Sequence, residues 1–479
     1  MSRGRDVPMY LCRRGNQTDK TEERMTETTT EDLARFAASV KYENIPAPAR
    51  EYCKDILLDT LACAFAGHFG EETDQIARFA KSLATSTEST VIGGDNLSLA
   101  GATLLNGYLI TAVTMCDIHR STLTHVTPEV VPPALLIGER DNVSGRDLLA
   151  ALAAGFEVTT RVGVGSDYPA VRKRGYHGPG VFGPFGAAAA AGRLRGLSPE
   201  AMARAFGLAG SQAGGTFAAW GTPTVKFHQC RGALSGLMAA LLAEQNFLAT
   251  REFLTAKDGG LFNTFSTGGH PEQVTAELGK RWEFEQIALR LWPSASSIQG
   301  MNTALFDALE ERPFKLKDIK RAQISLTPTV FNLHGKLSKY KAKFDALISA
   351  HYTAAVIIED HTLTLDQFTP ARYDDPVLRN AAANLIDVQP DESLTDVQAV
   401  VEFELNDGTK IVKRCNSPRG SADNRLTRAQ IESKMRTYAQ KRIGKAAIER
   451  IIASIWTLED VGSVRDLMQT MRQEIRAAA

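Results

Sequence analysis

The stretch SGRDLLAALAAGFEVTTRV, residues 144–162, shows the pattern on which the fold prediction rests. Ser144 is a typical N-cap residue. Large apolar side chains recur behind it at helical spacing, namely Leu148, Leu149, Leu152 and Phe156. Alanine and glycine occupy many of the remaining positions, so neighbouring helices can approach closely. The stretch therefore predicts a helix in a tightly packed, all-helical core.

The same character extends over residues 30–289. Helices are predicted over 31–39 with Thr30 as the N-cap, over 50–65, and around the five alanines enclosed by Gly186 and Gly192. Ser198-Pro199-Glu200 supplies an N-cap, a proline at the first helical position and an acidic residue in the first turn.

The pattern changes near residue 290. A strand is predicted over 319–330, a long buried helix over 344–358, and two strands over 397–405 and 409–415 flanking the turn Asn406-Asp407-Gly408. Helical periodicity returns from residue 426. We predict a mainly α protein, in which a large helical domain (30–289 plus 418–479) carries an inserted, smaller α+β domain (290–417).

Charge and composition exclude several classes of protein. Lys+Arg and Asp+Glu both number 55, which gives a net charge of zero and argues against a dedicated nucleic-acid binder. No run of about 18 apolar residues predicts a membrane span. The six cysteines form no CxxC pair, which favours reduced, buried thiols in a cytoplasmic protein without a metal or iron–sulfur site. No phosphate-cradling glycine loop or HExxH motif is present.

Residues 1–29 form a separate leader that we predict to be disordered. Its arginines are interrupted by four acidic residues, and its apolar run, Met9–Cys12, is too short for a secretory signal. Met25 is also a plausible natural start. The protein would be mitochondrial only if it is eukaryotic and this leader is a transit peptide.

Four polar groupings could carry chemistry. They are 116–125, with Asp117, His119 and His125; 172–180, with Arg174 and His177; 226–231, with Lys226 and His228; and 290–295, beginning with Arg290. Each also has a bland interpretation, such as a solvated loop with one capping aspartate or a basic surface turn. Their shared feature is cationic groups at irregular junctions, which suits recognition of an anion together with acid–base chemistry.

The order of these motifs resembles the MmgE/PrpD family, whose members include 2-methylcitrate dehydratase, cis-aconitate decarboxylase and iminodisuccinate epimerase. The resemblance rests on 57–61 followed by Ala66-Gly67, Leu105-Asn106-Gly107 leading to Asp117, Gly155–Val158, His177 with the alanine-rich helix, Gly207–Gln212, Lys226–Gly232 and Trp292-Pro293-Ser294. It spans nearly the whole chain, from Glu31 to Leu467.

The resemblance implies a homodimer whose α+β domain is a lid, with a cofactor-free active site between the domains. It also implies proton abstraction next to a carboxylate of a small di- or tricarboxylate. His125 and His177 match family active-site histidines, and Asp117 falls in a family aspartate-rich run. Lys226 approximates a family lysine, although its offset from His228 differs by one residue from the family pattern.

Several positions depart from the family. Met115 replaces the first aspartate of the run, His119 stands at a threonine position, and Ala295 replaces a histidine. Arg290 replaces the junction lysine; it can hold an anion but cannot act as a base at neutral pH.

Three hypotheses follow from the sequence. The first is a lyase in which His125, His177, Asp117 and His119 are catalytic, while Lys226, Arg290, Arg174 and His228 bind substrate. The second is an isomerase or epimerase of a similar acid. The third is a degraded paralogue that binds a carboxylate without converting it. His119 is the candidate to fill the volume vacated at Ala295.

Overall fold

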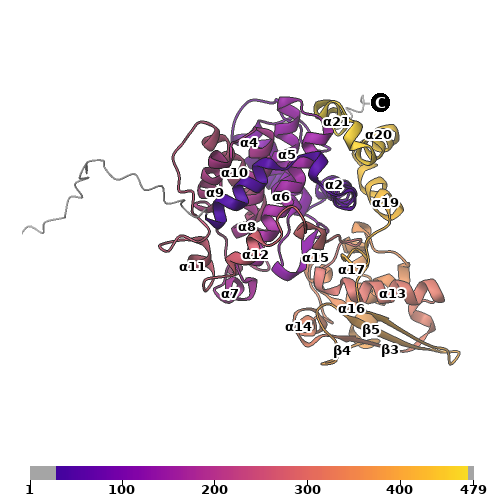
Figure 1. The fold of residues 1–479 in the computed structure, drawn as a ribbon. Coiled ribbons are helices and arrows are strands. Elements are labelled where there is room, and N and C mark those ends of the chain that lie inside the picture. Colours follow the sequence, from indigo (N-terminus) through magenta and orange to yellow (C-terminus); the bar gives the residue numbers. More distant parts are fainter. Residues whose placement is uncertain (1–27, 473–479) are drawn as a thin grey trace, which may run out of the picture.

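The computed structural model describes residues 28–472 and is mainly helical (Figure 1). The predicted leader lies outside the described residues, apart from its last two positions. Helix α1 (Thr29–Ser39) begins earlier than predicted, because Thr28 and Glu31 form a capping box. Thr30 is therefore not the cap. Its side chain is buried and accepts a hydrogen bond from the Leu254 amide at 3.0 Å.

Further helices in the described part of the chain build the helical layer: α2 (Ala47–Gly67), α3 (Thr73–Ser82), α4 (Leu99–Thr111), α5 (Thr127–Asp141), α6 (Gly145–Gly165), α7 (Tyr168–Lys173), α8 (Gly178–Leu194), α9 (Pro199–Gly210), α10 (Thr224–Glu244), α11 (Leu261–Phe265) and α12 (Pro271–Thr275). The predicted caps Ser144 and Ser198 are confirmed, since each accepts a backbone amide of its helix. Helix α8 packs between α6 and α10. A Cβ at Gly186 would lie 2.4 Å from the Gly155 carbonyl oxygen, so only glycine permits this approach.

Helix α6 is long and apolar enough to span a membrane, yet 94% of its apolar window is buried inside the protein. It carries a buried ion pair between Glu157 and Arg161, at 2.5 Å. The Arg161 guanidinium also donates to the carbonyls of Val274, Ala276 and Arg281. Glu157 accepts the amides of residues 283 and 284. The pair therefore fixes the segment that leads to residue 290.

A second hydrophobic core surrounds a four-stranded sheet in the order β4-β3-β5-β6. Its strands are β3 (Ile319–Leu326), β4 (Ile386–Pro390), β5 (Ala399–Leu405) and β6 (Lys410–Cys415), and only β3 and β4 are parallel. Its helices are α13 (Gln299–Glu311), α14 (Pro328–Val330), α15 (Lys343–Ile348), α16 (Ala350–Asp360), α17 (Pro370–Tyr373) and α18 (Pro376–Asn384). Figure 1 shows this α+β unit below the C-terminal helices.

Two predictions for this unit were wrong in detail. The strand predicted over 319–330 ends at Leu326, because Pro328 lies at the start of a helical turn that Thr327 caps. The helix predicted over 344–358 is two helices, since Ser349 interrupts it and caps α16 by accepting from the Tyr352 amide. The hairpin around residues 406–408 is confirmed, and strand β4 was not predicted.

The C-terminal helices α19 (Arg428–Ala439), α20 (Lys445–Trp456) and α21 (Val464–Thr470) pack on the N-terminal helices α2 and α5. They share one hydrophobic core with α2. A short antiparallel ribbon, β1 (Ile118–His119) and β2 (Ile287–Ala288), joins the loop after α4 to the segment that enters the α+β unit. The ribbon brings two of the predicted polar groupings together.

The C-terminal segment that packs against the start of α6 leaves no room for a side chain at Gly145. A Cβ there would lie 1.7 Å from the Leu458 carbonyl oxygen, whereas one at Gly462 would meet nothing within 4 Å. We expect Gly145→Ala to lower the free energy of unfolding by about 1–3 kcal/mol, because the 457–461 segment must move. Gly462→Ala is the matched control and should unfold like the wild type. Urea denaturation measures both, and equal stability of the two variants would contradict this packing.

Candidate active site

Asp117 organises the loop between α4 and α5. Its buried carboxylate accepts the amides of Val126 at 2.8 Å and Thr127 at 3.1 Å, and the Thr127 hydroxyl at 2.5 Å. These donors lie at the start of α5, so Asp117 caps that helix from nine residues upstream. Burial raises the pKa of Asp117, while the neighbouring His125 imidazole and these hydrogen bonds oppose the rise. Both carboxylate oxygens therefore accept hydrogen bonds from within the protein.

His125 is a neutral base with a defined tautomer. Its Nδ1 lies 2.6 Å from the Asp117 carbonyl oxygen. A carbonyl oxygen can only accept, so Nδ1 carries the proton and Nε2 keeps its lone pair. Burial, and then the charge of Arg290, lower the pKa of His125 to about 4. Part of the ring still reaches solvent. His125 is therefore uncharged at neutral pH and open at Nε2.

His177 precedes α8 and is only 5% exposed. Its Nδ1 lies 3.2 Å from Nδ1 of His228, so one imidazole donates to the other. Its ring meets the edge of Phe217, whose face is covered by the Arg172 guanidinium at 3.6 Å. Burial lowers the pKa of His177 to about 3, and the neighbouring imidazoles of His125 and His228 act in the same direction. The three imidazoles therefore share one neighbourhood.

Arg290 supplies the cation of this cluster. Its side chain is buried, and it donates to the Cys116 carbonyl oxygen, to the Cys116 sulfur at 3.5 Å and to the Ser294 carbonyl oxygen at 3.3 Å. Within residues 28–472 no carboxylate lies within 4 Å of it. Carbonyl and thiol partners hold the guanidinium in place without neutralising its charge. Such a group can bind a carboxylate in a water-poor setting.

Lys434 on α19 binds the backbone of Arg290, and the sequence did not predict this residue as part of the site. Its buried ammonium lies 2.6 Å from Asp59 Oδ1 and donates to the carbonyls of Arg290 at 2.8 Å and Met115 at 3.3 Å. Asp59 lies in the motif 57–61, but nothing in the sequence links it to a lysine 375 positions away. The pair joins α2 and α19 to both walls of the cluster.

Three predicted site residues have other partners. His119 is fully buried, with Nδ1 2.9 Å from the Thr122 hydroxyl and Nε2 3.3 Å from Glu283, so both ring nitrogens are engaged away from Ala295. The Lys226 ammonium donates to the Ala112 carbonyl at 2.7 Å and faces Glu72 at 3.5 Å. The exposed Arg174 donates to the carbonyls of residues 263 and 264.

The position of Lys226 follows from helix geometry. Residues two positions apart on an α-helix are about 200° apart around its axis. Lys226 and His228 therefore project to nearly opposite sides of α10. Phe217 and Arg172 were not predicted as site residues, although Arg172 lies in the same basic turn as His177.

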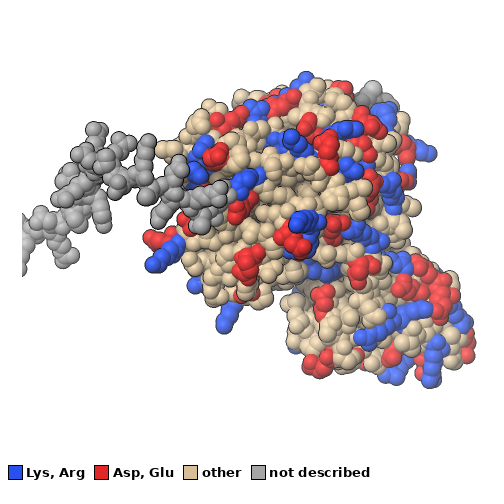
Figure 2. All heavy atoms as spheres, in the orientation of Figure 1, with Lys and Arg blue, Asp and Glu red and all other residues tan. Residues whose placement is uncertain are grey.

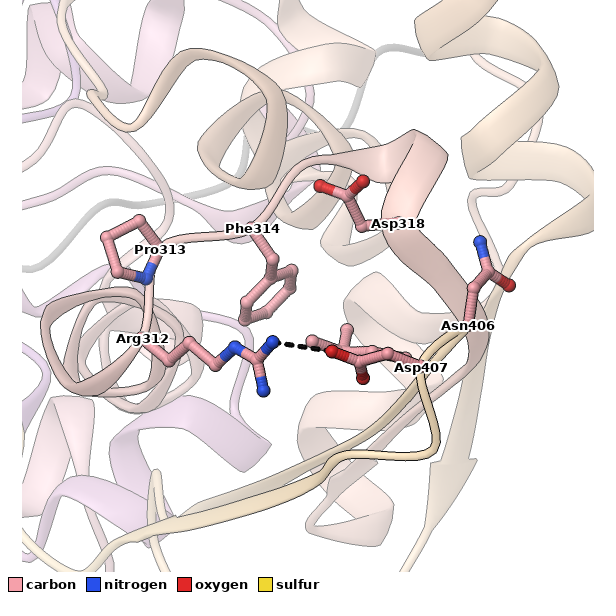
Figure 3. Close-up of a pocket in the computed structure, with 7 residues that line it drawn as sticks. Arg312, Pro313, Phe314, Asp318, Asn406 and Asp407 are labelled. Atoms are coloured by element: carbon pink, nitrogen blue, oxygen red, sulfur yellow. Dashed lines mark hydrogen bonds and ion pairs between the residues drawn. The ribbon is translucent and has the colours of Figure 1, made fainter.

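The described residues hold no group of three or more His, Cys, Asp or Glu side chains placed to bind one metal ion. A hollow of about 330 Å³ lies at the far end of the sheet, lined by Arg312, Phe314, Asp318 and the 405–407 turn (Figure 3). The Arg312–Asp407 ion pair, at 2.6 Å, crosses it. It contains none of the imidazoles, so we place the chemistry at the buried cluster instead. Figure 2 shows charges of both signs interspersed over the visible face.

The buried imidazole of His177 should make the fold acid-labile. An unfolded histidine titrates near pH 6.5 and His177 near 3, so between these values the unfolded chain binds the extra proton and stability falls as pH falls. At pH 5 this costs about 2 kcal/mol. We expect His177→Asn to flatten the fall of Tm between pH 7 and 5. The exposed His270→Gln is the control, and a wild-type slope in His177→Asn would refute the burial.

The Asp59–Lys434 pair should be costly to break. Lys434→Met leaves a fully buried carboxylate without its cation, and we expect a loss of about 3–5 kcal/mol in the free energy of unfolding. Adding Asp59→Asn should recover part of that loss. The control is Lys54→Met, because Lys54 is equally buried but its partners Glu51 and Glu459 reach solvent. Urea denaturation gives all four values; a double variant no more stable than Lys434→Met would count against the pair.

Comparison with known proteins identifies the family of this chain. The model of the MmgE/PrpD N-terminal domain matches residues 31–274, and that of the MmgE/PrpD C-terminal domain matches 292–460. The chain is 30% identical to a cis-aconitate decarboxylase-like protein of Aspergillus oryzae, over 96% of this chain and 99% of that protein. It is 25% identical to the cis-aconitate decarboxylases of Aspergillus terreus (94% and 96% covered) and Homo sapiens (91% and 93%). The chain therefore belongs to the MmgE/PrpD family.

Proposed function

We propose that this protein is a cofactor-independent lyase that acts on a small di- or tricarboxylate. The observation that carries the proposal is the neutral His125, open at Nε2, beside the buried Arg290, whose charge no protein carboxylate neutralises. A carboxylate bound to Arg290 would present its neighbouring carbon to that base. The family and the names of its relatives agree with a carboxylate substrate.

The chemistry needs two roles. His125 Nε2 takes the proton from the carbon next to the carboxylate, and the electron pair moves onto the carboxylate oxygens, where Arg290 stabilises the developing charge. The His177–His228 pair then returns or relays a proton to the substrate or leaving group. Asp117 orients His125 through its backbone carbonyl. Because both nitrogens of His119 have internal partners, we assign it to positioning the loop rather than to catalysis.

Decarboxylation is the first candidate reaction, since the relatives carry that name: the bond to one carboxylate breaks, CO2 leaves, and the electron pair left on the substrate carbon takes a proton from an imidazole of the cluster. Dehydration is the second: the proton leaves to His125, and the hydroxyl leaves as water with a proton from the His177–His228 pair. Met115 and Ala295 remove an acid and an imidazole that the family pattern has. An epimerase, or a protein that binds without turnover, would follow if those groups are essential for elimination. We further propose that the α+β unit acts as a lid and that the protein is cytoplasmic.

We also propose a homodimer. Four large apolar side chains near the end of α10 are exposed: Met238, Leu242, Phe247 and Leu248. Exposed clusters of this kind favour protein contacts.

A panel assay tests the proposed function. Purified protein should convert cis-aconitate, citrate or a related acid, followed by NMR in deuterated buffer. His125→Ala and His177→Ala should each lower kcat about 10²- to 10⁴-fold, because each removes an acid–base group. Arg290→Met should mainly raise KM, and His270→Gln should have no effect.

The outcomes separate the alternatives. Deuterium incorporation without net conversion would indicate an epimerase, and ligand-induced stabilisation without either would indicate a binding protein. Full activity in both histidine variants would reject the assignment.

A further inference from the structure

Arg120 is notable because no acidic side chain in the described part of the protein pairs with its charge. Its Nε is buried without a hydrogen-bond partner, and its side chain makes no hydrogen bond or ion pair with any residue in 28–472. The other arginines of the cluster all have partners, as Arg290 does with Cys116 and Ser294. A guanidinium offers five donors, and leaving them unpaired away from bulk water costs free energy.

The β1–β2 ribbon places Arg120 near the cluster. Ile118 pairs with Ala288, so Arg120 and Arg290 each lie two residues beyond that pair, at opposite ends of the ribbon. Arg120 directly follows β1 as the first residue of a 3-10 turn, and four residue steps of about 3.3 Å separate the levels of the two arginines, about 13 Å along the backbone. Cys116 contacts both Arg290 and His125. The two long side chains can therefore reach toward each other over Ile118.

The electrostatic surroundings agree with this placement. Burial lowers the pKa of Arg120, as does the charge of Arg290, whereas the charges of Asp396 and Asp423 raise it. Neither aspartate is within ion-pair distance, and both are exposed. Arg120 thus faces the junction with a positive neighbour and no bound acid.

We propose that Arg120 binds a second carboxylate of the ligand whose first carboxylate is held by Arg290. The proposal rests on the proposed function, and it makes Arg120 the residue that selects di- and tricarboxylates over monocarboxylates. Two guanidiniums flanking an apolar Ile118–Ala288 floor fit a short polycarboxylate, whose charged ends bind while its carbon chain packs between them.

Calorimetric titration with citrate and with butyrate tests this. A charged hydrogen bond contributes about 1.5–3 kcal/mol, so Arg120→Met should weaken citrate binding roughly 10- to 100-fold and leave butyrate unchanged. Arg120→Lys should recover part of the loss. The matched control is Arg204→Met, because Arg204 is also half-buried with a buried, unpartnered Nε but lies on α9. Circular dichroism confirms that each variant is folded.

Each result decides the matter. Wild-type citrate affinity in Arg120→Met, with catalysis intact, would overturn the role of Arg120 and leave the proposed function standing. No carboxylate binding by the wild type would overturn both. If Arg204→Met weakens citrate binding as much as Arg120→Met does, the loss is not specific to the junction and the proposal fails.

Discussion

The site depends on how the protein buries the guanidinium of Arg290 without a carboxylate partner. Removing such a charge from water is costly unless its hydrogen bonds are satisfied. Carbonyl oxygens of Cys116 and Ser294 satisfy them, and the Asp59–Lys434 pair fixes the backbone of Arg290 itself. Because that pair joins α2 to α19, Arg290 is held in this position only when helices from both ends of the chain are assembled.

The imidazoles depend on the same cation. A protonated His125 would face Arg290, and a protonated His177 would face His125 and His228 in a buried space. The cluster therefore holds its histidines neutral, as bases rather than as charges. A dianionic ligand would reverse that balance, since negative charge beside an imidazole raises its pKa. In the proposed reaction, ligand binding would therefore strengthen His125 as a base.

Local patterns in the sequence were sufficient for the caps Ser144 and Ser198 and for the hairpin at residues 406–408, because each depends on a few neighbouring residues. They were insufficient where the site depends on the direction of a side chain or on a contact between residues far apart in the sequence. Lys226 carries the right charge but projects from the other side of α10. Lys434 contacts Asp59 across 375 positions, and no periodicity encodes that contact. The histidine cluster lies between these cases: the residue types were predictable, but their partners were not.

The acids near the cluster explain why its cations remain available in a protein of zero net charge. Asp59 neutralises Lys434, and Asp117 caps α5. Glu129 is fully buried with neither oxygen hydrogen-bonded, and burial raises its pKa well above its usual value, which favours its neutral form. Each nearby carboxyl is thus paired, engaged by amides or neutral. The positive potential at Arg290 therefore remains for an anion from solution. A protein carboxylate at ion-pair distance would have cancelled that potential.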